Sequence, residues 1–166
     1  MKKIVLIRHA KSSWDHPGLA DHDRPLNQRG LRDAPFMAQM MAGRGWQPDA
    51  LVSSSAVRAR TTAAYFVEAL GRPAESLLIE PAIYEASVRT MQDLIGGLDP
   101  AWSSVALFGH NPTFTMLANQ FTRDFIDNLP TCGIVEILGA GVDAWPDFVP
   151  AAARVTAIHF PKQYFS

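Results

Sequence analysis

The sequence has a single cysteine, no long apolar run and almost no net charge. One cysteine, Cys132, excludes an internal disulfide and is consistent with a reducing compartment. Fifteen basic residues against sixteen acidic ones give a formal net charge of -1, so we expect no broad surface for nucleic acid or an anionic membrane. No stretch has the length of a membrane span, and residues 1–3 lead straight into a predicted strand instead of a signal-peptide segment. We therefore expect a cytoplasmic protein.

What remains is the composition of an ordinary globular protein, with 48% hydrophobic and 19% charged residues. A chain of 166 residues is large enough to bury a core and fits one domain. We find no internal repeat, low-complexity tract or linker. Residues 1–166 are expected to form a single domain.

Apolar runs alternate with helical stretches along most of the chain. The predicted strands are 4–7, 50–52, 77–79, 105–108, 133–138 and 154–160, and the predicted helices are about 27–43, 56–70, 87–98 and 112–122. Such alternation predicts an α/β fold, a three-layer α/β/α sandwich with a mainly parallel sheet. The last two strands have no clear helix between them, so we expect them to form an antiparallel edge.

Local patterns mark the ends of these helices. Asn27 and Ser87 are candidate N-caps, and Asn111 precedes a proline, Pro112, expected at the first helical position. Pro35 falls inside the first helical pattern, where it removes one hydrogen bond. We expect a kink or a restart of the helix there.

Arg8 and His9 follow a strand, 4–7, that is apolar throughout and so is expected to be buried on both faces. In an open α/β sheet, ligands bind at the carboxyl ends of such strands. A guanidinium offers a planar set of donors that fits phosphate, and a neutral imidazole can attack phosphorus. The pair therefore suggests phosphoryl chemistry.

Three segments in the same order resemble the motifs of the histidine phosphatase superfamily, which includes the cofactor-dependent phosphoglycerate mutases. They are 6–15 with its Arg-His pair, 53–63 with Ser-Ser-Ser-Ala-Val-Arg, and 109–112 with Gly-His-Asn-Pro. Any one of them is weak, but three in order are specific and span most of the chain. The short length and the Arg-His-Ala-Lys-Ser form are most similar to the small phosphohistidine phosphatases, which are known from phosphorelay signalling.

The resemblance implies a phosphoglycerate mutase-like fold and roles for four residues. His9 would attack phosphorus and form a phosphohistidine intermediate that water hydrolyses. Arg8 and Arg58 would hold the phosphoryl oxygens and lower the pKa of His9, and His110 would donate a further hydrogen bond. No metal or other cofactor is required. Thr62 is expected to pack within a helix, and Arg60 and Arg89 to be surface charges.

Two further assignments rest on the resemblance alone. Larger members use a glutamate after the third strand to protonate the leaving group, and Glu85 in Ile-Tyr-Glu occupies the matching stretch. An exposed carboxylate before a helix is the competing interpretation of Glu85. Ser12 matches a serine or threonine of the family and is a candidate phosphate ligand.

The sequence departs from the family pattern beside His9. Ala10 replaces the usual glycine, and Asp15 stands where many relatives have asparagine. An anion beside a phosphate is repulsive unless Lys11 or Arg24 compensates, so Asp15 is not assigned a phosphate contact. The segment 15–24 mixes carboxylates and imidazoles, and a solvated rim of the site is favoured over a metal site.

Other phosphatase and hydrolase classes lack their motifs. A cysteine phosphatase needs arginine six residues after its cysteine, and that position holds Leu138. No strand precedes Asp21-His22-Asp23 as it would in an aspartate-nucleophile phosphatase, and Gly-x-x-x-x-Gly-Lys and Gly-x-Ser-x-Gly are absent.

The resemblance therefore implies a metal-independent phosphatase that removes phosphate from phosphohistidine on a signalling protein. Two alternatives remain open: a phosphomonoesterase that acts on a small metabolite, and a phosphoprotein-binding module without turnover. The expected partner is a phosphorylated protein or a small phosphomonoester, with no nucleic acid or membrane.

Overall fold

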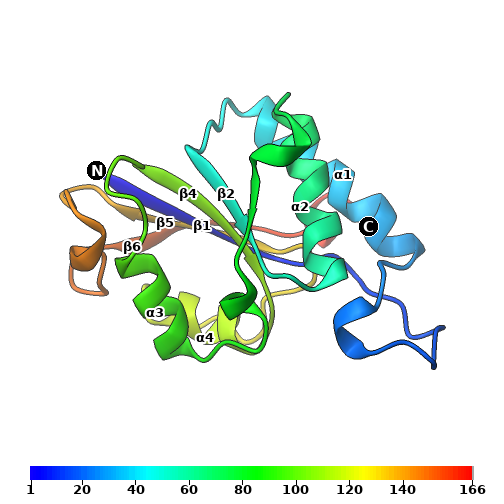
Figure 1. The fold of residues 1–166 in the computed structure, drawn as a ribbon. Helices are drawn as coiled ribbons and strands as arrows, with labels where there is room; N and C mark the ends of the chain where they lie inside the picture. Colours follow the sequence, from blue (N-terminus) through cyan, green and yellow to red (C-terminus); the bar gives the residue numbers. More distant parts are fainter. Residues whose placement is uncertain (166) are drawn as a thin grey trace.

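The structure, a computed structural model, describes residues 1–165 as a six-stranded sheet with helices on both faces (Figure 1). The strands are β1 (Lys2–Arg8), β2 (Ala50–Ser53), β3 (Leu77–Ile79), β4 (Ser104–Gly109), β5 (Ile134–Gly139) and β6 (Arg154–His159). The α-helices are α1 (Gln28–Gly43), α2 (Val57–Ala69), α3 (Val88–Gly96) and α4 (Thr113–Asn119). The predicted three-layer α/β fold is confirmed.

The strand order β3-β2-β4-β1-β5-β6 explains where the three motifs lie. β3, β2, β4 and β1 are parallel, whereas β5 and β6 pair antiparallel and form the predicted edge. In this register Arg8 is opposite Gly109, and Ser53 is opposite Phe108. The carboxyl ends of β1, β2 and β4 therefore meet at one edge of the sheet.

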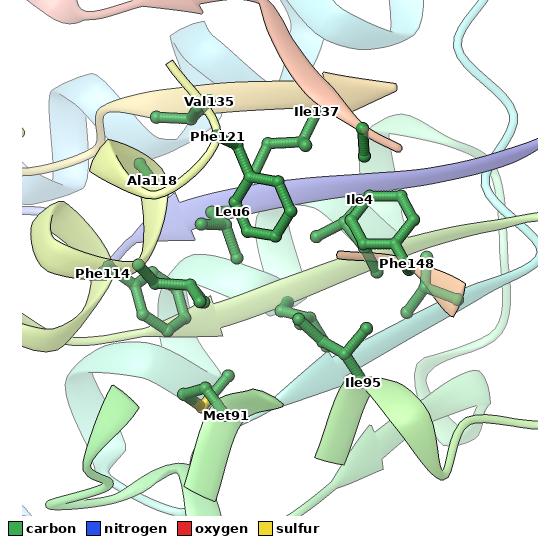
Figure 2. Close-up of a cluster of buried hydrophobic side chains, with 14 of the residues drawn as sticks. Ile4, Leu6, Met91, Ile95, Phe114, Ala118, Phe121, Val135, Ile137 and Phe148 are labelled. Carbon is green, nitrogen blue, oxygen red and sulfur yellow. The ribbon is translucent and has the colours of Figure 1, made fainter. Parts of the chain in front are cut away.

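Successive residues of β1 contribute to two different cores. Ile4 and Leu6 belong to the cluster that α3 and α4 cover, shown in Figure 2, and Val5 and Ile7 belong to the cluster under α1 and α2. All four side chains are fully buried. Alternate side chains of a strand point to opposite faces of the sheet, so a central strand between two helical layers must be apolar throughout. This is the physical origin of the uninterrupted run.

The helix ends follow the predicted caps with two exceptions. Asn27 and Ser87 accept hydrogen bonds from the amides of Gly30 and Thr90. α1 continues through Pro35, so the predicted restart was wrong; neighbouring turns supply enough hydrogen bonds to carry the helix past one missing donor. α4 begins at Thr113, one residue after the predicted start at Pro112, and it ends at Asn119 instead of near residue 122. Within residues 1–165, no helix is long and apolar enough to cross a membrane.

α1 lies very close to the segment that follows β1. A Cβ atom on Gly30 would stand 2.2 Å from the main-chain oxygen of Lys11. The amide of Asn27 donates to the same oxygen at 2.9 Å, which ties the start of the helix to this segment. Glycine at position 30 thus permits the contact that holds residues 10–12 in place.

Replacing Gly30 by alanine should lower the free energy of unfolding by about 1–3 kcal/mol, because backbone must move to admit the methyl group. The matched control is Gly43→Ala in the same helix, where the added Cβ meets nothing within 4 Å. That variant should be neutral or slightly more stable, since alanine favours helix over glycine. Urea unfolding of both variants measures the difference, and equal stabilities would contradict the close contact.

Candidate active site

The ends of β1, β2 and β4 are joined by main-chain hydrogen bonds. The amide of His9 donates to the oxygen of Gly109 at 3.1 Å, and the amide of Ser54 donates to the oxygen of Phe108 at 3.0 Å. On the other side, the amide of Cys132 donates to the oxygen of His9 at 3.0 Å. The backbone that carries the predicted site is therefore an extension of the sheet and shares its rigidity.

His9 is held as a neutral imidazole with a defined tautomer. Its side chain is buried, with 7% of the residue exposed, and Nδ1 lies 2.7 Å from the main-chain oxygen of Ala10. A carbonyl oxygen can only accept, so Nδ1 carries the proton and Nε2 carries the lone pair. Burial lowers the pKa of His9 to about 3 against the opposing effect of this hydrogen bond, and the nearby His110, Arg58 and Arg8 lower it further. The sequence predicted the direction from the arginines, but burial is the larger cause.

Arg58 reaches the site from the first turn of α2 and is bound by the segment after β1. Its Nη1 donates to the main-chain oxygen of Asp21 at 2.7 Å, and its Nη2 donates to Oδ2 of the same residue at 3.0 Å. The side chain of Arg58 is only 8% exposed. Both contacts fix the plane of the guanidinium.

Arg8 and His110 bring further donors from the other strand ends. Arg8 Nη1 donates to the main-chain oxygen of Leu129 at 2.9 Å, and Nε2 of His110 lies 2.8 Å from Oγ of Ser54. Burial lowers the pKa of Arg8 and that of His110, to about 4 for the histidine. The rings of His9 and His110 are 5.2 Å apart between centroids.

Three buried nitrogen atoms of this group have no hydrogen-bond partner within residues 1–165. They are Nε of Arg8, Nε of Arg58 and Nδ1 of His110. Buried polar groups are normally paired, and an unpaired donor costs free energy. Donors from three strand ends around a neutral imidazole form a site suited to a tetrahedral oxyanion.

Glu85 lies beside this group without a hydrogen bond among the described residues. Its backbone has a φ of 58°, in the left-handed region that residues other than glycine seldom adopt. Glu85 and His110 line one cavity of about 260 Å³. A larger cavity of about 630 Å³ beside β6 is lined by none of the predicted site residues, so size alone does not locate the site.

Ser12 is buried but is bound by protein atoms. Its Oγ accepts from Nη1 of Arg24 at 2.9 Å, and Nε of Arg24 donates to Oδ1 of Asp21 at 3.1 Å. Trp14, which is 72% exposed, stacks on the Arg24 guanidinium at 3.7 Å. Asp15 is exposed. Among residues 1–165, no three His, Cys, Asp or Glu side chains are placed to hold a metal ion.

Three residues near the site were missed by the sequence analysis or given a different role. Asp21 binds Arg58, and Oη of Tyr84 donates to Oδ2 of Asp21 at 2.7 Å. Thr62, expected only to pack, accepts from the amide of Ala10 at 3.0 Å and donates to the oxygen of Arg58 at 2.8 Å. These contacts join segments that are distant in sequence, and only the adjacency of Asp21 to the first motif hints at one of them.

Comparison with known proteins identifies the fold and the motifs together. The sequence model of the histidine phosphatase superfamily (branch 1) matches residues 4–96, more than half of the chain. The chain belongs to the histidine phosphatase superfamily. An uncharacterised protein of Mycobacterium tuberculosis is 32% identical over 94% of this chain and 100% of its own length. An uncharacterised chloroplast protein of Arabidopsis thaliana is 32% identical over 88% of this chain and 70% of its own length.

Solved structures of the superfamily extend the similarity to the whole fold. The solved structure of a SixA protein from Agrobacterium tumefaciens matches with a TM-score of 0.79 and 29% identity, over 96% of this chain and 98% of that one. The histidine phosphatase SixA in complex with tungstate also gives 0.79, at 18% identity, over 97% and 98% of the two chains. This histidine phosphatase is therefore SixA-like in fold.

Acid should destabilise the protein through His9. Its pKa is lower in the folded chain than in the unfolded one, so the unfolded chain takes up the extra proton as pH falls from about 6.5 towards 3. This linkage removes about 2 kcal/mol of unfolding free energy between pH 6.5 and pH 4.5. Urea unfolding at pH 6.5 and pH 4.5 measures the unfolding free energy that each protein loses. The loss in His9→Gln should be smaller than that in the wild type by about 2 kcal/mol. An equal loss in the two proteins would show that His9 titrates normally in the fold.

Proposed function

We propose that this chain is a metal-independent phosphatase in which His9 becomes transiently phosphorylated, and that its substrate is a phosphohistidine side chain on a signalling protein. The observation that carries the mechanism is the hydrogen bond from Nδ1 of His9 to the oxygen of Ala10, at 2.7 Å. It leaves the lone pair on Nε2 of a neutral ring, which is the form that attacks phosphorus. Membership of the superfamily supports the phosphatase activity.

The reaction would proceed in two displacements. Nε2 of His9 attacks phosphorus, the bond from phosphorus to the leaving group breaks, and the leaving group takes a proton from Glu85 or from water. Nδ1 keeps its proton and its bond to the Ala10 oxygen, so the phosphorylated ring stays in place. Water then attacks the phosphohistidine, which releases inorganic phosphate and restores the neutral ring. Each step is in line, so the leaving group and the water occupy the side opposite His9.

The buried donors would stabilise the charge that develops on the phosphoryl oxygens. Arg8 and Arg58 each carry a positive charge, and their buried Nε atoms have no hydrogen-bond partner within residues 1–165, so each guanidinium keeps an unused donor. His110 would donate from Nδ1 when the hydroxyl of Ser54 donates to its Nε2. Ser12 is bound to Arg24, and we propose that it acts by holding that arginine near the phosphate.

Glu85 would supply the proton for poor leaving groups. It shares a cavity with His110, and its left-handed backbone is the kind of strain that persists where the surrounding structure enforces a position. An alkoxide needs this proton, whereas an imidazole leaves more readily. The contribution of Glu85 should therefore depend on the leaving group.

Two observations favour a phosphorylated protein over a small metabolite. The protein histidine phosphatase SixA, solved with tungstate, and a SixA protein of Agrobacterium tumefaciens both match nearly the whole chain. In addition, Trp14 is largely exposed and stacks on Arg24, which itself contacts Asp21 of the site. Exposed aromatic side chains beside a pocket are typical of protein contacts.

The phosphorylated intermediate can be trapped on His9. Incubation with an acyl or aryl phosphate should give an acid-labile phosphoprotein adduct by mass spectrometry, and His9→Ala should give none and lose at least about a thousandfold in turnover. His16→Ala, which removes an exposed imidazole, is the matched control and should keep the adduct. Binding of phosphate compounds with neither adduct nor hydrolysis would favour a phosphoprotein-binding module instead.

The substrate class can be tested with a panel of leaving groups. We expect kcat/KM for a phosphohistidine-bearing protein domain to exceed that for aryl and sugar phosphates by at least about tenfold. Glu85→Gln should lower turnover of the sugar phosphates by about a hundredfold and that of phosphohistidine much less. A preference for a small metabolite would overturn the proposed substrate and leave the His9 mechanism standing.

A further inference from the structure

The carboxylate of Asp21 accepts a hydrogen bond from Arg58, one of the two arginines proposed to bind the phosphoryl group. Nη1 of Arg58 donates to the main-chain oxygen of Asp21, and Nη2 donates to its Oδ2, at 2.7 and 3.0 Å. One residue therefore occupies both ends of the guanidinium fork, and Nε of Arg58 is the buried donor left without a partner in residues 1–165. Asp21 thus fixes the orientation of the Arg58 guanidinium through Nη1 and Nη2.

Asp21 is itself fixed by two further donors. Oη of Tyr84 donates to Oδ2 at 2.7 Å, and Nε of Arg24 donates to Oδ1 at 3.1 Å. These hydrogen bonds, that of Tyr84 first, lower the pKa of Asp21 to about 2. The carboxylate is therefore charged at every pH at which the enzyme would work, and its position is determined by its neighbours.

The charge of Asp21 lies on the solvent side of the site. Its side chain is 50% exposed, whereas that of Arg58 is 8% exposed and His9 is buried. The ring of Tyr84 packs edge-on against that of His110, with 5.6 Å between centroids, which places the Asp21–Tyr84 pair beside the site's second histidine. Since in-line attack by buried His9 directs the leaving group outward, the leaving group passes the face that carries Asp21.

A fixed negative charge at this point discriminates between substrates. Like charges a few ångströms apart repel, and water at the half-exposed Asp21 weakens this repulsion without abolishing it, whereas a neutral or cationic group is tolerated or attracted. Arg24 and Arg58 together carry more charge than Asp21, but both guanidiniums are hydrogen-bonded to its oxygens, so loss of this carboxylate would make the potential at this point more positive. A second anionic group on the leaving group would approach the Asp21 carboxylate. Arg24 and Arg58 already donate hydrogen bonds to Asp21, so neither is free to pair with that group.

We propose that Asp21 is a specificity-determining residue that excludes phosphate esters bearing a second anionic group near the phosphate. Substrates with a neutral or cationic leaving group, such as the imidazole of a phosphohistidine side chain, are accepted. This inference rests on the proposed phosphatase function and narrows its substrate class. Asp21 also positions Arg58. Removing the Asp21 carboxylate would therefore change both the charge that the leaving group meets and the position of Arg58, and the two effects must be measured separately.

Phenyl phosphate and 3-carboxyphenyl phosphate separate the two consequences, because they differ by one carboxylate that does not assist hydrolysis. In Asp21→Asn, turnover of both should fall, since Arg58 loses its anchor. The ratio of their kcat/KM values should meanwhile shift by about 5- to 30-fold towards the carboxylated substrate. Asp23→Asn removes an equal charge two residues away, where the carboxylate is 57% exposed and its ion pair among residues 1–165 is with His22, and its ratio should stay within about twofold of wild type.

An unchanged ratio in Asp21→Asn, with turnover reduced for both substrates, would overturn the proposal and leave Asp21 a structural role. Asp21→Ser provides a second neutral variant if the first does not fold, as judged by thermal unfolding. If the wild-type protein hydrolyses neither these two substrates nor a phosphohistidine-bearing protein domain, the proposed function fails, and the inference is still tested by binding. Calorimetry with phenylphosphonate and 3-carboxyphenylphosphonate should then show the same shift in the ratio of dissociation constants.

Discussion

A site for a phosphoryl group must hold positive charge and unpaired donors close together before any anion arrives, and the surrounding structure is organised by that constraint. Arg8 and Arg58 repel each other, and each is held by an oxygen of another segment, Leu129 for the first and Asp21 for the second. Burial keeps His9 and His110 uncharged, which limits the positive charge to the two guanidiniums. Main-chain bonds between strand ends hold the segments of Arg8, His9 and His110 together, and Thr62 links the backbone of Arg58 to them.

The fold could be predicted from the sequence because its main features follow from local patterns. β1 must be apolar throughout because it lies between two helical layers, and the same requirement produces the runs of β2 and β4. Right-handed crossovers between parallel strands then bring the three strand ends to one edge. His9, Arg58 and His110 were expected to meet for this reason, and the structure places them together.

The contacts that hold the site could not be predicted in the same way. Asp21 and Arg58 are 37 residues apart, Tyr84 and Asp21 are 63 apart, and Thr62 and Ala10 are 52 apart. Each of these hydrogen bonds joins two segments that do not pair as strands. The hydrophobic pattern of the sequence therefore does not indicate which residues will meet. The mixture of carboxylates and imidazoles in 15–24 suggested only a solvated rim, since a sequence does not show which carboxylate faces an arginine. Helix ends were less certain for a similar reason, as the early end of α4 shows.

Thr62 joins two parts of the site that the sheet does not connect directly. Its hydroxyl accepts from the amide of Ala10, next to His9, and donates to the oxygen of Arg58. A single oxygen atom thus joins the loop that follows β1 to the first turn of α2. We expect this link to limit relative movement between the backbone beside His9 and that of Arg58 when the helix moves against the sheet.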